Sequence, residues 1–295
     1  MSYSASPRPT FDGPAHIPYE TVTRHLWGDE ESGEVADWIY VSSSKIHQLV
    51  FGLPPGGAFR HSDNYRTIFA ADEVLYVLSG VMVLSNPETG EVHRVGQGEA
   101  AFFRRDTWHH AFNFSAEPLR VIEFFAPPPS QGTSGSYAQT KPNLTSPKYS
   151  QDQWIGRWPK ASAQAAENFT IRPVRDGDLL WRLEGAEQQL LVGILAATEH
   201  LTVGKMQLLA GQRSDLEVHG GDEGLYLLEG ALNVRVPEND GPRWFELKPG
   251  DGFFVPEGAP HQYYNMSDAP ASFLCGVAPR YSPDIPDLFS NGREP

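Results

Sequence analysis

Short apolar stretches separated by turn residues recur along the chain. The stretches at 74–78, 81–84 and 225–228 consist almost entirely of Val, Leu, Met and Tyr. Runs of this length, bounded by Gly or Pro, are typical of buried β-strands. The longest comparable run, at 190–197, is too short to cross a bilayer. The pattern therefore predicts an all-β fold built from many short strands.

The composition favours short strands and frequent turns over long helices. The chain contains 28 glycines and 25 prolines among its 295 residues, and both residue types interrupt regular structure. Hydrophobic residues make up 40% of the chain and charged residues 20%, which is ordinary for a globular protein. A chain of this length predicts about two domains.

Charge and cysteine content limit the partners and the compartment. The formal net charge is -14, and no Lys/Arg cluster is dense enough to follow a phosphate backbone. Cys275 is the only cysteine, so no internal disulfide can form. The first residues lack the basic start and apolar core of a secretory signal. We therefore expect a cytoplasmic protein with no nucleic-acid or membrane partner.

Two histidines and two glutamates in the C-terminal half suggest a metal site. Glu217 and His219 are two residues apart, so on an extended strand their side chains share one face. Glu223 follows across a Gly-Gly turn, and His261 follows a Pro-bounded segment that restricts the direction of its ring. Two imidazoles with one or two carboxylates suit a divalent transition metal.

The spacing around the first three of these residues resembles the first motif of the cupin family. Gly211 is followed after five residues by Glu217-x-His219, then by Glu223 after three residues and Gly230 after six. The family usually has His-x-His where this chain has Glu217-x-His219. The substitution leaves open whether Glu217 is a ligand, a general base or a solvated side chain.

The segment that contains His261 matches the second cupin motif at every position. Gly250, Pro256, Gly258, His261 and Asn265 occur at the spacing that the motif requires. The resemblance implies a small antiparallel β-barrel of the jelly-roll type with a metal at its mouth. In the family the metal is held by three His and one Glu.

The first half of the chain repeats these patterns in a weaker form. Glu73 and Gly80 mirror Glu223 and Gly230. The second motif recurs from Gly98 through His109 to Asn113, with Arg104 and Asp106 in place of its Pro and Gly. Self-similarity at this distance indicates duplicated domains. The chain therefore resembles a two-domain cupin, or bicupin.

The repeat and the composition predict the domain boundaries. Residues 127–136 are rich in Pro, Ser and Gly, as in a linker. The polar and Pro-rich N-terminus is expected to lie outside the core, on the surface or on a partner. We expect an N-terminal arm at 1–35, a first barrel at 36–126, a linker with short helices near 151–154 and 161–166 within 127–178, a second barrel at 179–281 and a tail at 282–295.

The resemblance assigns His219, Glu223, His261 and Glu217 as metal ligands in the second barrel. His219, His261 and Glu223 alone form a set of two His and one carboxylate with open coordination positions, which suits Fe(II), with Mn, Ni or Zn as alternatives. Glu217 is then a fourth ligand or a catalytic base.

The aromatic residues of the second barrel are candidates for a substrate wall. We single out Tyr226 and Tyr263 as substrate-binding residues, with core packing as the alternative for each. In the first barrel, Thr67 and Phe69 occupy the positions of His-x-His.

A second metal site is a weaker expectation in the first barrel. It would require an inserted loop to bring His61 to Glu73 and His109. The alternative is a barrel without a metal that is kept for folding and assembly.

The resemblance favours a metal-dependent enzyme that acts on a small organic molecule, most closely a non-haem iron dioxygenase. Two alternatives stay open: an isomerase or lyase that polarises a carbonyl at the metal, and a non-catalytic binding protein. The family also implies a homo-oligomer, a dimer or larger.

Overall fold

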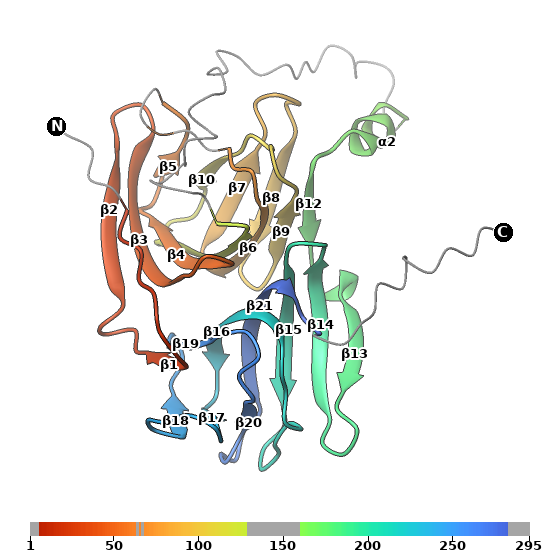
Figure 1. The fold of residues 1–295 in the computed structure, drawn as a ribbon. Helices are drawn as coiled ribbons and strands as arrows, with labels where there is room; N and C mark the ends of the chain where they lie inside the picture. The colour runs from red at the N-terminus through yellow and green to blue at the C-terminus, as the bar shows by residue number, and fades with distance from the viewer. Residues whose placement is uncertain (1–5, 63–64, 66–67, 129–159, 283–295) are drawn as a thin grey trace. The chain divides into compact units, whose positions relative to one another are not determined.

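The computed structural model describes residues 6–62, 65, 68–128 and 160–282. Two compact units divide the chain, and each combines segments that are distant in sequence. Unit 1 contains Met1–Thr10 and Val22–Leu180, and unit 2 contains Phe11–Thr21 and Trp181–Pro295. The described part contains no helix that is both long enough and apolar enough to span a membrane. Almost all of its regular structure is antiparallel β-sheet, which confirms the predicted all-β class (Figure 1).

Unit 1 consists of a seven-stranded sheet in the order β12-β9-β6-β11-β4-β3-β2 and a four-stranded sheet in the order β5-β10-β7-β8. Its strands are β2 (Thr23–Asp29), β3 (Gly33–Ser42), β4 (His47–Leu53), β5 (Ala58–Phe59), β6 (Asp72–Ser79), β7 (Val81–Ser85), β8 (Val92–Gly96), β9 (Ala100–Phe103), β10 (His110–Asn113), β11 (Leu119–Ala126) and β12 (Ile171–Val174). The two sheets form a jelly-roll barrel around one apolar core.

Unit 2 repeats this plan with a seven-stranded sheet in the order β1-β19-β16-β21-β15-β14-β13 and a three-stranded sheet in the order β18-β17-β20. Its strands are β1 (Ala15–Ile17), β13 (Leu180–Glu184), β14 (Leu190–Ala197), β15 (Thr202–Leu208), β16 (Gly220–Glu229), β17 (Leu232–Arg235), β18 (Trp244–Leu247), β19 (Gly252–Val255), β20 (Gln262–Tyr264) and β21 (Ala271–Arg280). The shared strand order confirms two tandem barrels.

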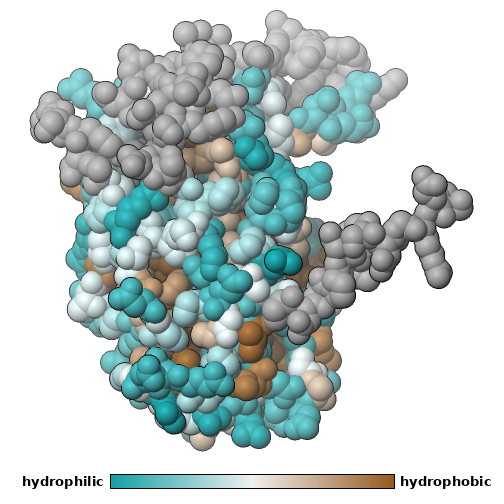
Figure 2. All heavy atoms as spheres, in the orientation of Figure 1, coloured by the Kyte–Doolittle hydropathy of each residue, from teal (hydrophilic) through white to brown (hydrophobic). Residues whose placement is uncertain are grey.

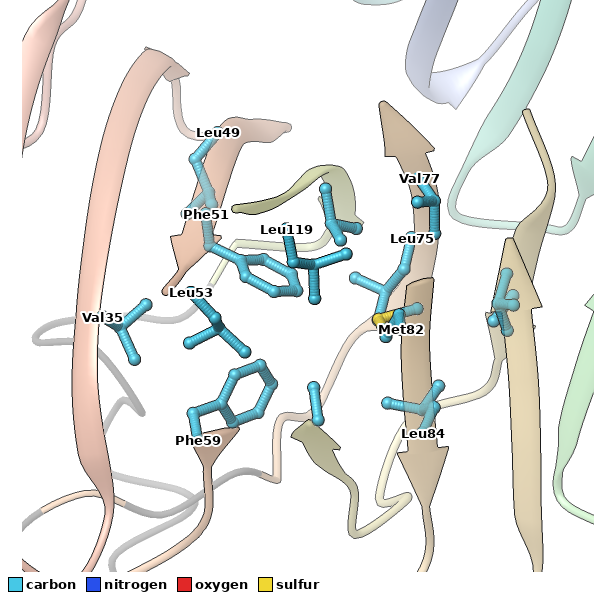
Figure 3. Packing of buried hydrophobic residues seen from close by; sticks show 14 of the residues in the cluster. Val35, Leu49, Phe51, Leu53, Phe59, Leu75, Val77, Met82, Leu84 and Leu119 are labelled. Atoms are coloured by element: carbon cyan, nitrogen blue, oxygen red, sulfur yellow. The ribbon is translucent and has the colours of Figure 1, made fainter. Parts of the chain in front are cut away.

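Alternation along the strands explains the core of unit 1. Leu49, Phe51 and Leu53 occupy every second position of β4 and are buried between the sheets. From the smaller sheet, Met82 and Leu84 of β7 belong to the same cluster (Figure 3). Both sheets thereby remove one apolar face from water, which is the main driving force for this architecture.

The same alternation places polar chemistry inside unit 2. Leu225 and Leu227 of β16 point into the core, where they meet Leu232 and Val234 of β17. Glu223 is two residues before Leu225, so its side chain points to the same interior face, and it is fully buried. A carboxylate inside an apolar barrel requires compensating partners.

Matching turns in the two units support the duplication. The side-chain amide of Asn113 donates to the carbonyl oxygens of Leu53, Pro54 and Glu117, while that of Asn265 donates to Leu208 and Ala269. Gly258 has a φ of 78°, and Asp106, its counterpart in unit 1, has a φ of 69°. Unit 1 therefore keeps the left-handed turn although it has lost the glycine.

The N-terminal residues differ from the predicted arm. β1 pairs with β19 in unit 2 and β2 pairs with β3 in unit 1, so both extend sheets. The arm predicted at 1–35 therefore includes two edge strands that the sequence did not indicate. Main-chain pairing explains the difference, because an exposed sheet edge accepts a short strand even when its side chains are polar. The imidazole of His16 adds a 2.8 Å contact to Asp251.

The predicted linker also contributes to a barrel. β12 pairs with β9 and forms the edge of the large sheet of unit 1. The helix expected near 161–166 is present as α2 (Lys160–Glu167), whereas 151–154 lies outside the described residues. On the face shown in Figure 2, the described surface is mostly hydrophilic and has separate apolar patches.

Candidate metal centre

Main-chain pairing brings the predicted ligands of unit 2 together at one end of the barrel. Glu217 and His261 form an isolated antiparallel bridge, with N···O distances of 2.8 and 3.0 Å. The carbonyl oxygen of His219 accepts a hydrogen bond from the backbone N–H of Gly258, which lies in the turn between Pro256 and His261. Glu223 lies on β16, directly beside β19 and β21. Backbone contacts thus position each ligand before any ion is bound.

Three of the predicted ligands form one compact group, and the fourth, Glu223, contacts its two histidines. Ligand atoms of Glu217, His219 and His261 lie within 4.8 Å of one another. Glu223 Oε2 lies 3.2 Å from His219 Nε2 and 3.0 Å from His261 Nε2. Glu217 Oε2 lies 3.8 Å from His219 Nε2. The structure therefore groups Glu217, His219 and His261, and it places Glu223 against both histidines.

The orientation of the two imidazoles suits metal ligation. Nδ1 of His219 lies 2.8 Å from the carbonyl oxygen of Tyr281, and Nδ1 of His261 lies 3.1 Å from that of Ala259. Each Nδ1 must carry a proton to make this contact, so Nε2 is the ring atom that faces the carboxylates and is available to a metal ion. Second-layer carbonyls fix metal-binding histidines in the same way.

Three buried atoms at this point have no hydrogen-bond partner: Glu217 Oε2, His219 Nε2 and Glu223 Oε2. Buried polar atoms without partners are rare because each carries a desolvation cost. Electron-pair donors that converge on one point are the atoms a cation would satisfy. The donor set, two imidazole nitrogens and two carboxylates, therefore fits a divalent transition metal.

The electrostatics of the metal-free site already favour positive charge. Burial opposes ionisation of Glu223, but the charge of His261 outweighs it and holds the Glu223 pKa well below its usual range. Burial lowers the pKa of His261, yet Glu223 raises it to about 9. Burial raises the pKa of Glu217 to about 7. A metal ion that bound here would have to displace the proton of His261.

The buried phenol of Tyr263 forms a hydrogen bond with Glu223. The hydroxyl group of Tyr263 donates to Glu223 Oε1 at 2.5 Å and lies 3.1 Å from His261 Nε2. Tyr263 is completely buried and does not line the cavity beside the site. It therefore contacts the ligands and does not form the substrate wall predicted for it. Burial, and after it the nearby Glu223 carboxylate, raise the pKa of the Cys275 thiol. The hydrogen bond from Tyr263 engages Oε1 of Glu223, while Oε2 faces the two histidines.

A cavity of about 250 Å³ opens beside the ligands. Its described lining consists of Glu184, Gly185, Asp215, Leu216, Glu217, Val218, His219, Tyr281 and Ser282. Sequence reasoning missed Glu184 and Tyr281, whose side chains are joined by a hydrogen bond from the phenol of Tyr281 to the carboxylate of Glu184. Glu184 lies on the edge strand β13 and Tyr281 directly follows β21, positions that no motif marks.

Tyr226 does not take the position predicted for it. It follows Leu225 on β16, and Leu225 points into the core, so Tyr226 points to the opposite face. Its hydroxyl group lies beside Gly250 and it does not line the cavity. The structure therefore does not place Tyr226 where it could contact a substrate at this site.

In unit 1 the counterpart of the site is enclosed by aromatic rings. His109 Nε2 lies 3.9 Å from Glu73 Oε2. The rings of Phe59, Phe69 and Phe103 pack around His109 at centroid distances of 5.8, 6.3 and 4.6 Å. Burial lowers the pKa of His109 to about 4, so the imidazole is neutral.

A second carboxyl group replaces the thiol in unit 1. Glu123 pairs with Leu75 across the sheet in the same register as Cys275 with Leu225. The carboxyl groups of Glu73 and Glu123 are buried neighbours, an arrangement that disfavours ionisation of both. Burial raises the Glu123 pKa to about 7, and burial with the neighbouring Glu123 raises that of Glu73 well above its usual range.

His61 lies apart from Glu73 and His109. Its Nδ1 is 2.5 Å from Nε2 of His110, and its ring packs edge-on against Trp108. His110 points away from His109 because neighbouring residues of a strand alternate in direction. Within the described residues, the one group of three or more candidate ligands is that of unit 2. The structure therefore does not assemble the second site expected from His61, Glu73 and His109.

A family comparison agrees with the duplication. The family described as "Cupin domain" matches residues 49–125 and 204–277. These segments contain Glu73 and His109 in the first half, and Glu217, His219, Glu223 and His261 in the second. A search of curated proteins finds no significant match.

Solved structures are similar in fold over nearly the whole chain. A putative glyoxylate-induced protein from Pseudomonas aeruginosa has a TM-score of 0.64 at 16% identity, covering 94% of this chain and 93% of that one. The protein Ylba from E. coli has a TM-score of 0.59 at 13% identity, covering 93% and 94%. The S161A mutant of Bacillus subtilis oxalate decarboxylase has a TM-score of 0.56 at 16% identity, covering 92% and 78%.

Proposed function

This chain belongs to the cupin family, and we propose that its second cupin domain is the metal centre of an enzyme that acts on a small organic molecule. The observation that carries the proposal is the convergence of Glu217 Oε2, His219 Nε2 and Glu223 Oε2, all buried and without hydrogen-bond partners. A divalent ion would satisfy them together with His261. The adjacent cavity gives a small molecule access to the same point.

Each residue has a distinct role in this proposal. His219, His261 and Glu223 would hold the ion, and Tyr263 keeps Glu223 in its orientation. Glu217 faces the cavity, where it is a fourth ligand or a base. When bound, Fe(II) would supply an open coordination position for a substrate oxygen and for dioxygen. We infer a non-haem iron dioxygenase as the most direct use of two histidines and a carboxylate.

A metal-dependent isomerase or lyase is the second candidate, and Glu217 favours it. Burial raises the pKa of this carboxyl to about 7, which is close to the optimum for a group that takes and returns a proton near neutral pH. Glu217 also lines the cavity, so it can reach a proton of a bound molecule. In this case a bound ion would supply Lewis-acid polarisation of a carbonyl group, and the reaction would consume no dioxygen.

Metal analysis and oxygen uptake together test the proposal. The chain is purified without chelators, its metal content is measured, and a panel of small phenols, diketones and hydroxy acids is assayed with and without dioxygen. Turnover that consumes dioxygen supports the dioxygenase, while turnover in its absence supports the isomerase or lyase. Metal binding without turnover of any compound would indicate a binding protein. Absence of any stably bound metal would overturn the proposal itself.

A further inference from the structure

The cavity beside the metal centre is lined by acidic groups. Three of its nine described lining residues are carboxylates, Glu184, Asp215 and Glu217, and none of the nine is Lys or Arg. Carboxylates alone do not define a ligand-binding site. A second observation comes from His219, which lines the same cavity. Its side chain is only 4% exposed, and its Nε2 has no hydrogen-bond partner. The cavity therefore leads to a buried atom that requires a ligand.

The two outer carboxylates are held in place by defined donors. The backbone N–H groups of Ala186, Glu187 and Gln188 donate to Asp215 at 2.6 to 3.0 Å. Glu184 forms an ion pair with Arg182, and it accepts the hydrogen bond from the Tyr281 phenol. Arg182 is thus committed to a carboxylate, and it also lies over the Tyr281 ring at 5.3 Å from the centroid.

The substitution in the first motif changes the charge of the centre. A dication held by three imidazoles and one carboxylate carries a net charge of about +1 by formal counting. With Glu217 in place of one imidazole, the two carboxylates neutralise the dication. Asp215 adds a negative charge nearby, while Glu184 and Arg182 cancel one another. The surroundings of the open coordination position are therefore neutral to negative, which disfavours an anion.

We propose that the substrate is a small molecule that presents hydroxyl or ammonium groups to the acidic lining of the cavity and carries no carboxylate. This inference rests on the proposed metal centre and adds its substrate class. A volume of about 250 Å³ lies below the range typical of drug-sized ligands, so the molecule has few heavy atoms. Glu184 is the specificity-determining residue, because its carboxylate balances Arg182 at the wall.

Matched probes test this charge preference on the metal-loaded chain. Glycolate and 2-aminoethanol share a hydroxymethyl group and differ in whether the second group is a carboxylate or an ammonium. Their dissociation constants are measured by titration of the Mn(II)-loaded protein, before and after Glu184→Gln. We expect the substitution to tighten glycolate and weaken 2-aminoethanol, each by about three- to fivefold, the size of one partly screened charge.

Glu187→Gln provides the matched control. This variant makes the same change in net charge close to Glu184 in the chain, but Glu187 does not line this cavity. It should leave both dissociation constants unchanged within error. Equal effects of the two variants, weaker glycolate binding in Glu184→Gln, or no binding of either probe to the loaded chain would each overturn the inference. Failure of the wild-type chain to hold Mn(II) would instead overturn the metal centre, so the two failures are distinguishable.

Discussion

Removing the Tyr263 hydroxyl group should weaken metal binding without changing a ligand. Tyr263 donates to Glu223 Oε1 at 2.5 Å and is fully buried. The substitution Tyr263→Phe deletes one oxygen atom and keeps the ring that packs against Phe273 at 5.0 Å. Glu223 then loses a donor that fixes its orientation.

The size of the effect follows from the type of bond. A hydrogen bond to a charged group contributes about 1.5–3 kcal/mol, and the loss of a second-layer partner typically lowers metal affinity about 10–100-fold. The two ranges agree, since a factor of ten corresponds to about 1.4 kcal/mol. We therefore expect Tyr263→Phe to raise the Mn(II) dissociation constant about 10–100-fold.

Competition with a chromogenic chelator measures this affinity directly. Tyr264→Phe is the matched control, because its hydroxyl group donates to Gln262 at 2.7 Å and has no contact with the ligands. Thermal unfolding of the metal-free variants checks that both remain folded. If Tyr263→Phe binds Mn(II) as tightly as Tyr264→Phe, the phenol does not position Glu223 and this reasoning is wrong.

Further predictions concern stability. Burial raises the pKa of Glu217 to about 7, so folding favours its protonated form. In the metal-free chain, Glu217→Gln should therefore raise the free energy of unfolding by about 1–3 kcal/mol at pH 8. Urea titrations should show this gain disappearing as the pH falls toward 4.5. Gly221→Ala places a Cβ 2.1 Å from the Ala278 carbonyl oxygen and should lower the free energy of unfolding by about 2 kcal/mol or more. The control is Gly177→Ala, where the added Cβ meets nothing within 4 Å. Equal stability of the two variants would contradict the close packing at Gly221. Losing the carboxylate contact of His16 should cost about 1 kcal/mol in His16→Ala, and unchanged calorimetric unfolding would show that β1 docks without it.

The sequence predicted the duplicated barrel because the turns of this fold require particular residues. Gly250 and Gly258 adopt φ values of 94° and 78°, which L-residues rarely adopt. Asn265 satisfies two carbonyl oxygens at once. Such positions tolerate few alternatives, so their spacing was visible without a structure. The spacing also located His261, which follows the same turn.

Other features could not be predicted, because they depend on contacts between segments distant in sequence. β1 and β12 complete sheets whose other strands are far along the chain, and backbone pairing leaves little side-chain signature. Glu184 lines the cavity beside Tyr281, which comes from a segment 97 residues further along the chain. The inward direction of Tyr263 and the outward direction of Tyr226 depend on the register of their strands, which the aromatic content alone does not give.

Unit 1 shows how residues of the cupin motifs can persist without forming a metal site. Glu73 and His109 remain in position, but Phe69 lies where the family has a histidine, and its ring packs against His109. Burial and the neighbouring Glu123 carboxyl raise the pKa of Glu73. Glu73 Oε2 is also buried without a hydrogen-bond partner, but the described residues of unit 1 bring no group of three candidate ligands together, whereas those of unit 2 do.

Metal stoichiometry in three proteins tests the central account most directly: the wild-type chain, His261→Ala and His109→Ala, each purified without chelators and analysed by elemental mass spectrometry. The two variants remove the equivalent histidine from each barrel. We predict about one metal ion per chain in the wild type and in His109→Ala, and a loss of nearly all metal in His261→Ala. Full metal content in folded His261→Ala, or its loss in His109→Ala alone, would contradict a metal centre in the second barrel.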